Sequence, residues 1–126
     1  VLAGRLADAW RGFFGDSTYG VMQCTGDDYG EIHHAAVSPT IGREYIARHR
    51  PFFEGYRHLY ADRELQDVAA ARGVFRQCAS LTIYHDHWTR GQTPDRLPAD
   101  RRGVIHGAAK SDAALYESRK ASGFPE

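Results

Sequence analysis

The residues best suited to chemistry are two histidines near the end of a predicted strand. His85 and His87 are separated by one residue, and on a strand this spacing points both side chains to the same face of the sheet. Two imidazoles on one face can share a ligand or a divalent metal ion. They can equally hydrogen-bond to loop backbone and titrate near neutral pH. The spacing fits a shared site and this structural alternative about equally.

Two acidic residues open the helix predicted directly before this strand, over residues 62–72. Asp62 stands at the expected N-cap, Glu64 follows two residues later, and Gly73 lies just past the predicted end, where glycine commonly terminates a helix. A carboxylate at a helix start accepts backbone N–H groups and faces the positive end of the helix dipole. A side chain held in this way suits a plain N-cap and also a general base.

Four further residues are candidates for contacts with a substrate. Trp88 follows the two histidines, and its aromatic face can stack on a sugar ring or a nucleobase. His58 lies shortly before Asp62, in a stretch without clear periodicity. Asp27 and Asp28 lie in a turn-rich loop that follows a predicted strand.

The predicted helices and strands that position these residues indicate an α/β fold, with a small mixed sheet flanked by three or four helices. Alternation over 74–84 places Cys78 and Leu81 on opposite faces of a strand. A stop at 38–40 predicts the start of a helix with Ile41, Tyr45 and Ile46 on one face. The other predicted elements are an opening helix ending at residue 15, strands over 19–24 and 32–37, a loop over 91–102 and a helix over 108–122.

The composition restricts the class of protein. The chain has 126 residues, and its 16 Lys+Arg balance its 16 Asp+Glu, so it lacks the basic excess that binding to a phosphate backbone needs. We therefore expect no nucleic-acid partner. Residues 1–126 are expected to form a single domain or part of one. The two cysteines lie in separate apolar segments and are expected to be reduced core thiols.

The sequence pattern also bears on location. No apolar run approaches the roughly 20 residues of a membrane-spanning helix, and no signal peptide is recognisable. We therefore expect a cytoplasmic protein without a transmembrane segment. Because Val1 stands in the middle of a helical pattern, we expect the natural N-terminus to lie upstream.

Taken together, these motifs resemble the C-terminal half of GT-A-type glycosyltransferases, in particular the bacterial and phage members of family 2 and its relatives. The resemblance runs from about residue 19 to the end of the chain. Its first part is the order of an acidic helix start at Asp62, a glycine, a strand and then His85. Its second part is the closing segment, which consists of Lys110, Ser111, Asp112, Tyr116, Arg119, Gly123, Phe124 and Pro125.

The resemblance implies a metal-dependent transfer of a sugar from a nucleotide-diphosphate donor to a hydroxyl acceptor. Asp62 would act as the catalytic base or hold the acceptor hydroxyl, and Glu64 matches the acidic residue often found two positions later. His85, with His87 next in line, would help to bind Mn²⁺ or Mg²⁺ on the donor diphosphate. The nucleotide-binding half would lie upstream of the present residues, so the isolated chain is expected to be inactive.

Two departures from the family pattern leave alternatives open. Ala61 replaces the glutamate that many members carry before the motif aspartate, so the base can be Asp62 or Glu64. Asp27 and Asp28 resemble a metal-binding Asp-x-Asp motif, but one helix and one strand before them leave no room for a nucleotide-binding fold. We therefore expect an acceptor-side loop there.

Two other classes of function fit the same residues. A metal-dependent hydrolase or nuclease would use His85 and His87 with Asp62 or Glu64 as ligands and would need no sugar nucleotide. In a non-catalytic interaction domain, the histidines would be structural and added metal would change nothing.

Overall fold

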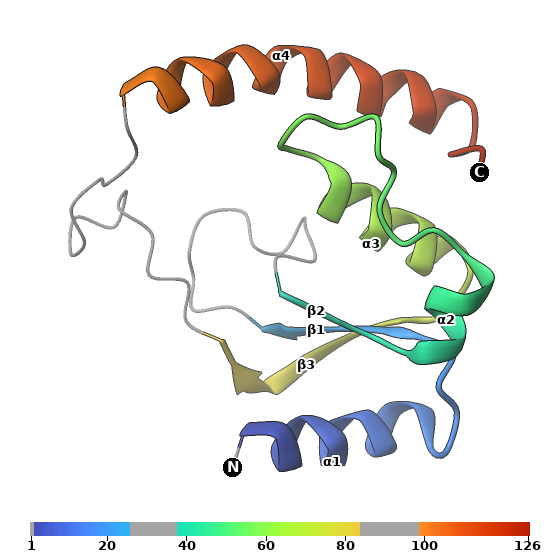
Figure 1. Ribbon diagram of the computed structural model, residues 1–126. Coiled ribbons are helices and arrows are strands. Elements are labelled where there is room, and N and C mark those ends of the chain that lie inside the picture. The colour runs from blue at the N-terminus through green and yellow to red at the C-terminus, as the bar shows by residue number, and fades with distance from the viewer. Residues whose placement is uncertain (1, 26–37, 84–98) are drawn as a thin grey trace.

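The computed structural model describes residues 2–25, 38–83 and 99–126 (Figure 1). These residues form four helices and three strands. In chain order they are α1 (Leu2–Phe14), β1 (Val21–Thr25), β2 (Pro39–Ile41), α2 (Arg43–Arg48), α3 (Ala61–Ala71), β3 (Phe75–Thr82) and α4 (Ala99–Ala121).

The strands form a mixed sheet in the order β2-β1-β3. The central strand β1 is antiparallel to β2 and parallel to β3. Helix α1 covers one face of the sheet, α3 lies over the other, and α4 lies beyond α3 as an outer layer (Figure 1). The prediction of an α/β fold with a small mixed sheet between helices is therefore confirmed. Within the described ranges, no helix is both long and apolar enough to cross a membrane.

The core is divided by the sheet into two clusters because successive side chains of β1 point to opposite faces. Val21 packs with Tyr45, Leu65 and Ala69 on the α3 side. The other cluster lies on the α1 side and contains Met22, Cys24, Cys78 and Leu81, with Leu6, Trp10 and Phe14 of α1 packed against it.

Cys24 and Cys78 are opposite each other in the parallel ladder, and both are buried free thiols. Burial, together with the neighbouring Cys78, raises the pKa of the Cys24 thiol. The prediction of reduced core thiols is confirmed.

The predicted alternation along the last strand is wrong at its end. Cys78 and Leu81 were expected on opposite faces, but both belong to the cluster on the α1 side. The register explains this, because Cys24 pairs with Cys78 whereas Thr25 pairs with Thr82. Such a shift places extra residues on one strand and turns the following side chains to the other face.

The segment predicted as a helix start at residues 38–40 is instead the edge strand β2, and helix α2 begins only at Arg43. Its amides pair with β1, and the Gly42 N–H continues the pattern by donating to the Gly20 carbonyl at 3.0 Å. A Cβ at position 42 would lie 2.1 Å from the Thr18 carbonyl oxygen, so only glycine fits. Tyr45 and Ile46 do not share a face, since Tyr45 is buried and Ile46 is 52% exposed.

Two other predicted boundaries need correction. Helix α4 begins at Ala99, inside the segment predicted as a loop, because Ala99, Arg101 and Arg102 are good helix formers. Helix α3 begins at Ala61, with Tyr60 rather than Asp62 as the N-cap. Its end agrees with the prediction, because Gly73 follows with a φ of 74°. The strand predicted over 32–37 lies outside the described residues.

Candidate functional site

The elements that carry the predicted site, β1, β3 and α3, have their relevant ends toward one edge of the sheet. The parallel strands β1 and β3 end at Thr25 and Thr82, which are register partners. Helix α3 leads into β3 through Gly73, so α3 runs back over the sheet and its first turn lies toward this same edge (Figure 1). In α/β sheets, ligand sites form at the carboxyl ends of the strands.

Asp62 is the second residue of α3 and is half-buried. Its Oδ1 accepts the backbone N–H of Arg63 at 2.8 Å, the one hydrogen bond that the described residues give to this carboxylate. The charge lies in the first turn, where the helix dipole favours an anion. Because Tyr60 caps the helix, Asp62 is free of the capping role predicted for it.

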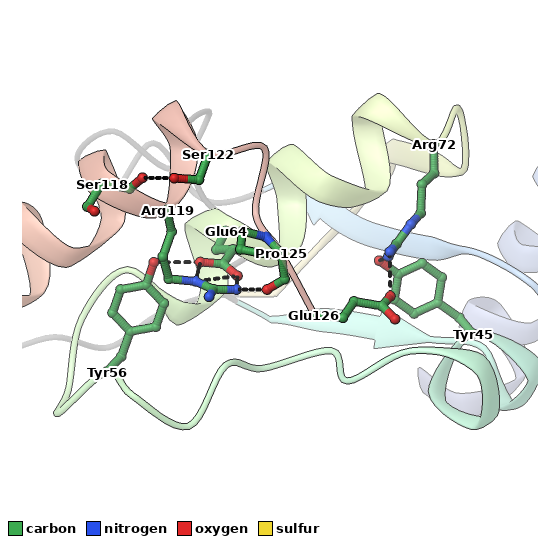
Figure 2. A network of polar contacts seen from close by, with 9 residues as sticks. All are labelled: Tyr45, Tyr56, Glu64, Arg72, Ser118, Arg119, Ser122, Pro125 and Glu126. Atoms are coloured by element: carbon green, nitrogen blue, oxygen red, sulfur yellow. Dashed lines mark hydrogen bonds and ion pairs between the residues drawn. The ribbon is translucent and has the colours of Figure 1, made fainter.

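Glu64, two positions further along the same turn of α3, is in a different environment. It is 7% exposed, and Arg119 of α4 donates to it with Nη2 at 2.8 Å from Oε1 and Nε at 2.9 Å from Oε2. The Tyr56 hydroxyl donates to Oε2 at 2.6 Å. Figure 2 shows these three side chains converging from the loop, α3 and α4. Both carboxylate oxygens of Glu64 are therefore occupied.

Arg119, the charged partner of Glu64, makes further contacts of its own. Arg119 donates to the Pro125 carbonyl at 2.8 Å, and its guanidinium carbon lies 3.5 Å from the centre of the Phe53 ring. The hydrogen bond to Glu64 raises the pKa of Arg119. Burial, and then the hydrogen bond to Glu64, raises the pKa of Tyr56. This cluster keeps a charged pair beside a neutral phenol.

A second anchor of α4 is Asp112, which is 1% exposed. Its carboxylate accepts the backbone N–H groups of Arg57, His58 and Leu59 at 3.0, 2.8 and 2.8 Å. Burial acts to raise the pKa of Asp112, but the three amide donors outweigh it and the pKa is lowered. The predicted substrate residue His58 thus contributes its backbone to this anchor, while its side chain is exposed.

Tyr116 lies between these two anchors on α4. It is fully buried, its hydroxyl donates to Asp67 of α3, and its ring lies 5.3 Å from the ring of Tyr60. Burial and the hydrogen bond to Asp67 raise the pKa of Tyr116 to about 12. Helix α4 therefore contacts the loop, the N-cap and the body of α3.

The predicted site residues are only partly within the described chain. Asp62, Glu64 and His58 are described, and Asp62 and Glu64 share a helical turn but not an environment. The remaining predicted site residues, His85, His87, Trp88, Asp27 and Asp28, lie outside the described residues, so their placement stays a prediction.

Sequence reasoning did not assign Tyr56, Asp112 and Arg119 to the site. A signal for two of them exists in the sequence. Ala108, Asp112, Tyr116 and Arg119 are spaced by four, four and three residues, which defines one face of a helix. A buried face that carries an aspartate and an arginine predicts polar partners on the neighbouring element.

The donor chemistry of the described residues bears on the implied metal. The Asp62 carboxylate accepts one hydrogen bond from the described residues, and a carboxylate suits a hard divalent cation. The oxygens of Glu64 are taken by Arg119 and Tyr56. No group of three or more His, Cys, Asp and Glu side chains gathers within residues 2–25, 38–83 and 99–126. The two candidate histidine ligands lie outside these ranges.

Comparisons of the chain with protein-family models, with curated proteins and with solved structures find no match in any of the three. The functional assignment therefore rests on the residues and geometry of the chain itself.

Proposed function

We propose that this chain is the acceptor-side part of a GT-A-type glycosyltransferase, which transfers a sugar from a nucleotide-diphosphate donor to a hydroxyl. The observation that carries the proposal is the position of Asp62. Asp62 is the second residue of α3, and the first turn of this helix lies toward the edge where the parallel strands β1 and β3 end.

In this proposal Asp62 is the base. It is half-buried and receives one hydrogen bond from the described residues, so its carboxylate has lone pairs left to accept the proton of an acceptor hydroxyl. Glu64 is a poor candidate for this role because its two oxygens already accept Arg119 and Tyr56. The sequence left open whether Asp62 or Glu64 is the base, and these hydrogen bonds favour Asp62.

The proposed metal ligand His85 follows Thr82 by three residues, and Asp27 follows Thr25 by two. Three residues of chain span about 10 Å at most, so the proposal expects both residues within that reach of the strand ends. His85, with His87 beside it, would hold Mn²⁺ or Mg²⁺. When bound, the ion would neutralise charge on the leaving diphosphate. Trp88, His58 and Asp28 would then contact the donor or the acceptor.

The test is sugar transfer by the full-length protein, with the donor-binding half that the proposal requires. A panel of sugar nucleotides, Mn²⁺ and hydroxyl acceptors is supplied, and the readouts are release of nucleoside diphosphate and formation of glycosylated product. Asp62→Asn should lower turnover by about 10²–10⁴-fold, because the amide cannot take the proton. Asp8→Asn is the matched control, since Asp8 is an exposed residue of α1. Phosphoester hydrolysis without any sugar nucleotide would instead support the hydrolase, and full activity of Asp62→Asn would contradict the proposed base.

A binding measurement tests the metal separately. Mn²⁺ at millimolar concentration should raise the melting temperature of the full-length, donor-competent protein, because a ligand that binds only the folded state stabilises it. His85→Ala should abolish this rise, and His87→Ala shows which imidazole contributes more. An equal rise in both variants would place the ion elsewhere, and no rise in the wild type would favour the interaction domain.

A further inference from the structure

We infer that α4 sets the position of Asp62, with Asp112 and Arg119 as positioning residues for the carboxylate that the proposed function uses. The inference rests on that proposed function for its catalytic meaning. The structural part of the inference is that α4 anchors the chain on both sides of Asp62. No described hydrogen bond joins Asp62 itself to α4.

The anchor before Asp62 is the carboxylate of Asp112. It accepts three consecutive backbone N–H groups, from residues 57 to 59, and it is 1% exposed. A charge that is buried and satisfied by three amides fixes the path of those amides, since moving them would leave the charge without partners. This anchor ends three residues before Asp62.

Between the anchor and the helix lies Tyr60, with a φ of 70°. A tyrosine rarely adopts this left-handed conformation, and it persists only where the surroundings hold it. Here the preceding Leu59 N–H is bonded to Asp112, the Tyr60 ring packs on Tyr116, and the Tyr60 carbonyl accepts the Glu64 N–H at 2.9 Å. The turn that points the chain into α3 therefore depends on two residues of α4.

The anchor after Asp62 is the ion pair between Glu64 and Arg119, whose side chains are 9% and 12% exposed. It is bidentate, which fixes orientation as well as distance. Tyr56 binds the same carboxylate from the loop, so the loop and the first turn of α3 are tied at one point (Figure 2). This anchor lies two residues after Asp62.

Both anchors lie on the same face of α4, seven residues apart, which is about 10 Å along a helix axis. A rigid helix thus fixes residues 59 and 64 relative to each other, with Asp62 between them. The carboxylate of Asp62 has one local hydrogen bond from the described residues, so its place depends on these anchors. A misplacement of about 1 Å can lower a rate by about 10²-fold.

The experiment compares Asp112→Asn, Arg119→Lys and Arg119→Gln with the matched control Glu117→Gln, an exposed residue on the same helix. The first measurement is structural and needs no substrate. It follows by NMR the carboxyl carbon resonance of Asp62 and the amide exchange of residues 57–64, well below the melting temperature. Asp112→Asn and Arg119→Gln should shift the resonance and speed exchange at least 10-fold there, with exchange in the sheet unchanged.

The second measurement is kinetic and uses the same variants in the full-length protein. Asp112→Asn and Arg119→Gln should lower kcat by about 10²-fold with the KM for the sugar nucleotide changed less than about twofold. Arg119→Lys should recover part of kcat, because the ammonium retains one charged contact with Glu64 but not the fork. Glu117→Gln should match the wild type in both measurements.

The outcomes separate the two hypotheses. If the full-length wild type transfers no sugar but the Asp62 resonance and the local exchange respond as described, the proposed function fails and the positioning stands. If the variants lose melting temperature while the Asp62 resonance, the local exchange and kcat stay as in the wild type, Asp112 and Arg119 serve general stability and the inference is overturned.

Discussion

Asp62 and Glu64 are two residues apart in one helical turn, yet their surroundings give them different chemistry. Glu64 is buried and accepts three donor groups from two side chains. Asp62 is half-buried and accepts one described backbone amide. A carboxylate whose lone pairs are filled by fixed donors holds structure, whereas one that accepts a single hydrogen bond from the described residues is the better candidate to take a proton. This contrast decides which of the two we propose as the base.

The buried pair makes a prediction about stability. Arg119→Met should lower the free energy of unfolding by about 3–5 kcal/mol, because it leaves the Glu64 charge buried without its partner. Adding Glu64→Leu should restore a large part of the loss, since the uncompensated charge is then removed. Urea unfolding of the two single variants and the double variant measures the coupling.

The exposed pair of Arg48 and Glu44 on α2 is the control for that cycle. Its side chains are 59% and 38% exposed, so Glu44→Gln should change the free energy of unfolding by less than about 1 kcal/mol. A loss at Arg119 as small as the loss at Glu44 would mean that the buried pair is not a structural anchor.

Tyr116 gives a prediction about alkaline pH. Its pKa is raised from 10 to about 12 in the folded protein, so between these values the unfolded chain loses the phenol proton first. The stabilisation is therefore complete below about pH 10 and is lost as pH rises toward about 12, by an amount on the order of 2 kcal/mol. Urea unfolding from pH 9 to 11.5 should show this decline, and Tyr116→Phe should flatten it. An equal slope in Tyr116→Phe would assign the decline to other groups, such as Tyr56.

At the scale of elements, α3 is defined by its two ends. Tyr60, with its left-handed backbone, begins the helix, and Gly73, with a φ of 74°, ends it and turns the chain into β3. The Val74 N–H then donates to the Ala69 carbonyl at 3.0 Å, which closes the turn. Because of these two ends, the first turn of α3 lies toward the same edge of the sheet as the end of β3 (Figure 1).

Replacing two glycines by alanine should change the stability of the protein in opposite directions. Gly73→Ala should destabilise the protein by about 1–2 kcal/mol, because a Cβ is strained in the left-handed region. Gly107→Ala in the middle of α4 should stabilise it by about 0.5–1 kcal/mol, since no described heavy atom lies within 4 Å of the added Cβ. Thermal and urea unfolding measure both. A stabilising Gly73→Ala would contradict the helix end described here.

At the scale of the whole molecule, the fold is a stack in which the sheet lies between α1 and α3, and α4 lies over α3 (Figure 1). Residues more than 50 positions apart meet at the α3–α4 boundary, as Glu64 and Arg119 do. The order of the layers explains why the closing segment of the chain, from Asp112 to Pro125, is tied to the helix that carries Asp62.

The sequence by itself determined the α/β class, the opening helix, the α3–Gly73–β3 unit and the buried thiols, because each depends on local periodicity or on the backbone preference of one residue. It also singled out Asp62 and Glu64 as a pair. It did not predict that residues 39–41 form an edge strand, since the pairing partner lies about 18 residues away at Val21–Gln23. Nor did it predict the shift that brings Leu81 beside Cys78.

Only the tertiary structure decided the different surroundings of Asp62 and Glu64 and the partners on α4. Whether a carboxylate is a structural anchor or an available base depends on which donors reach it, and those of Glu64 come from Tyr56 and Arg119, eight residues before it and 55 residues after it. The same holds for Asp112, whose three amide donors lie 53 to 55 residues away. Local pattern places a residue on a helix face, but packing between distant segments decides what that face meets.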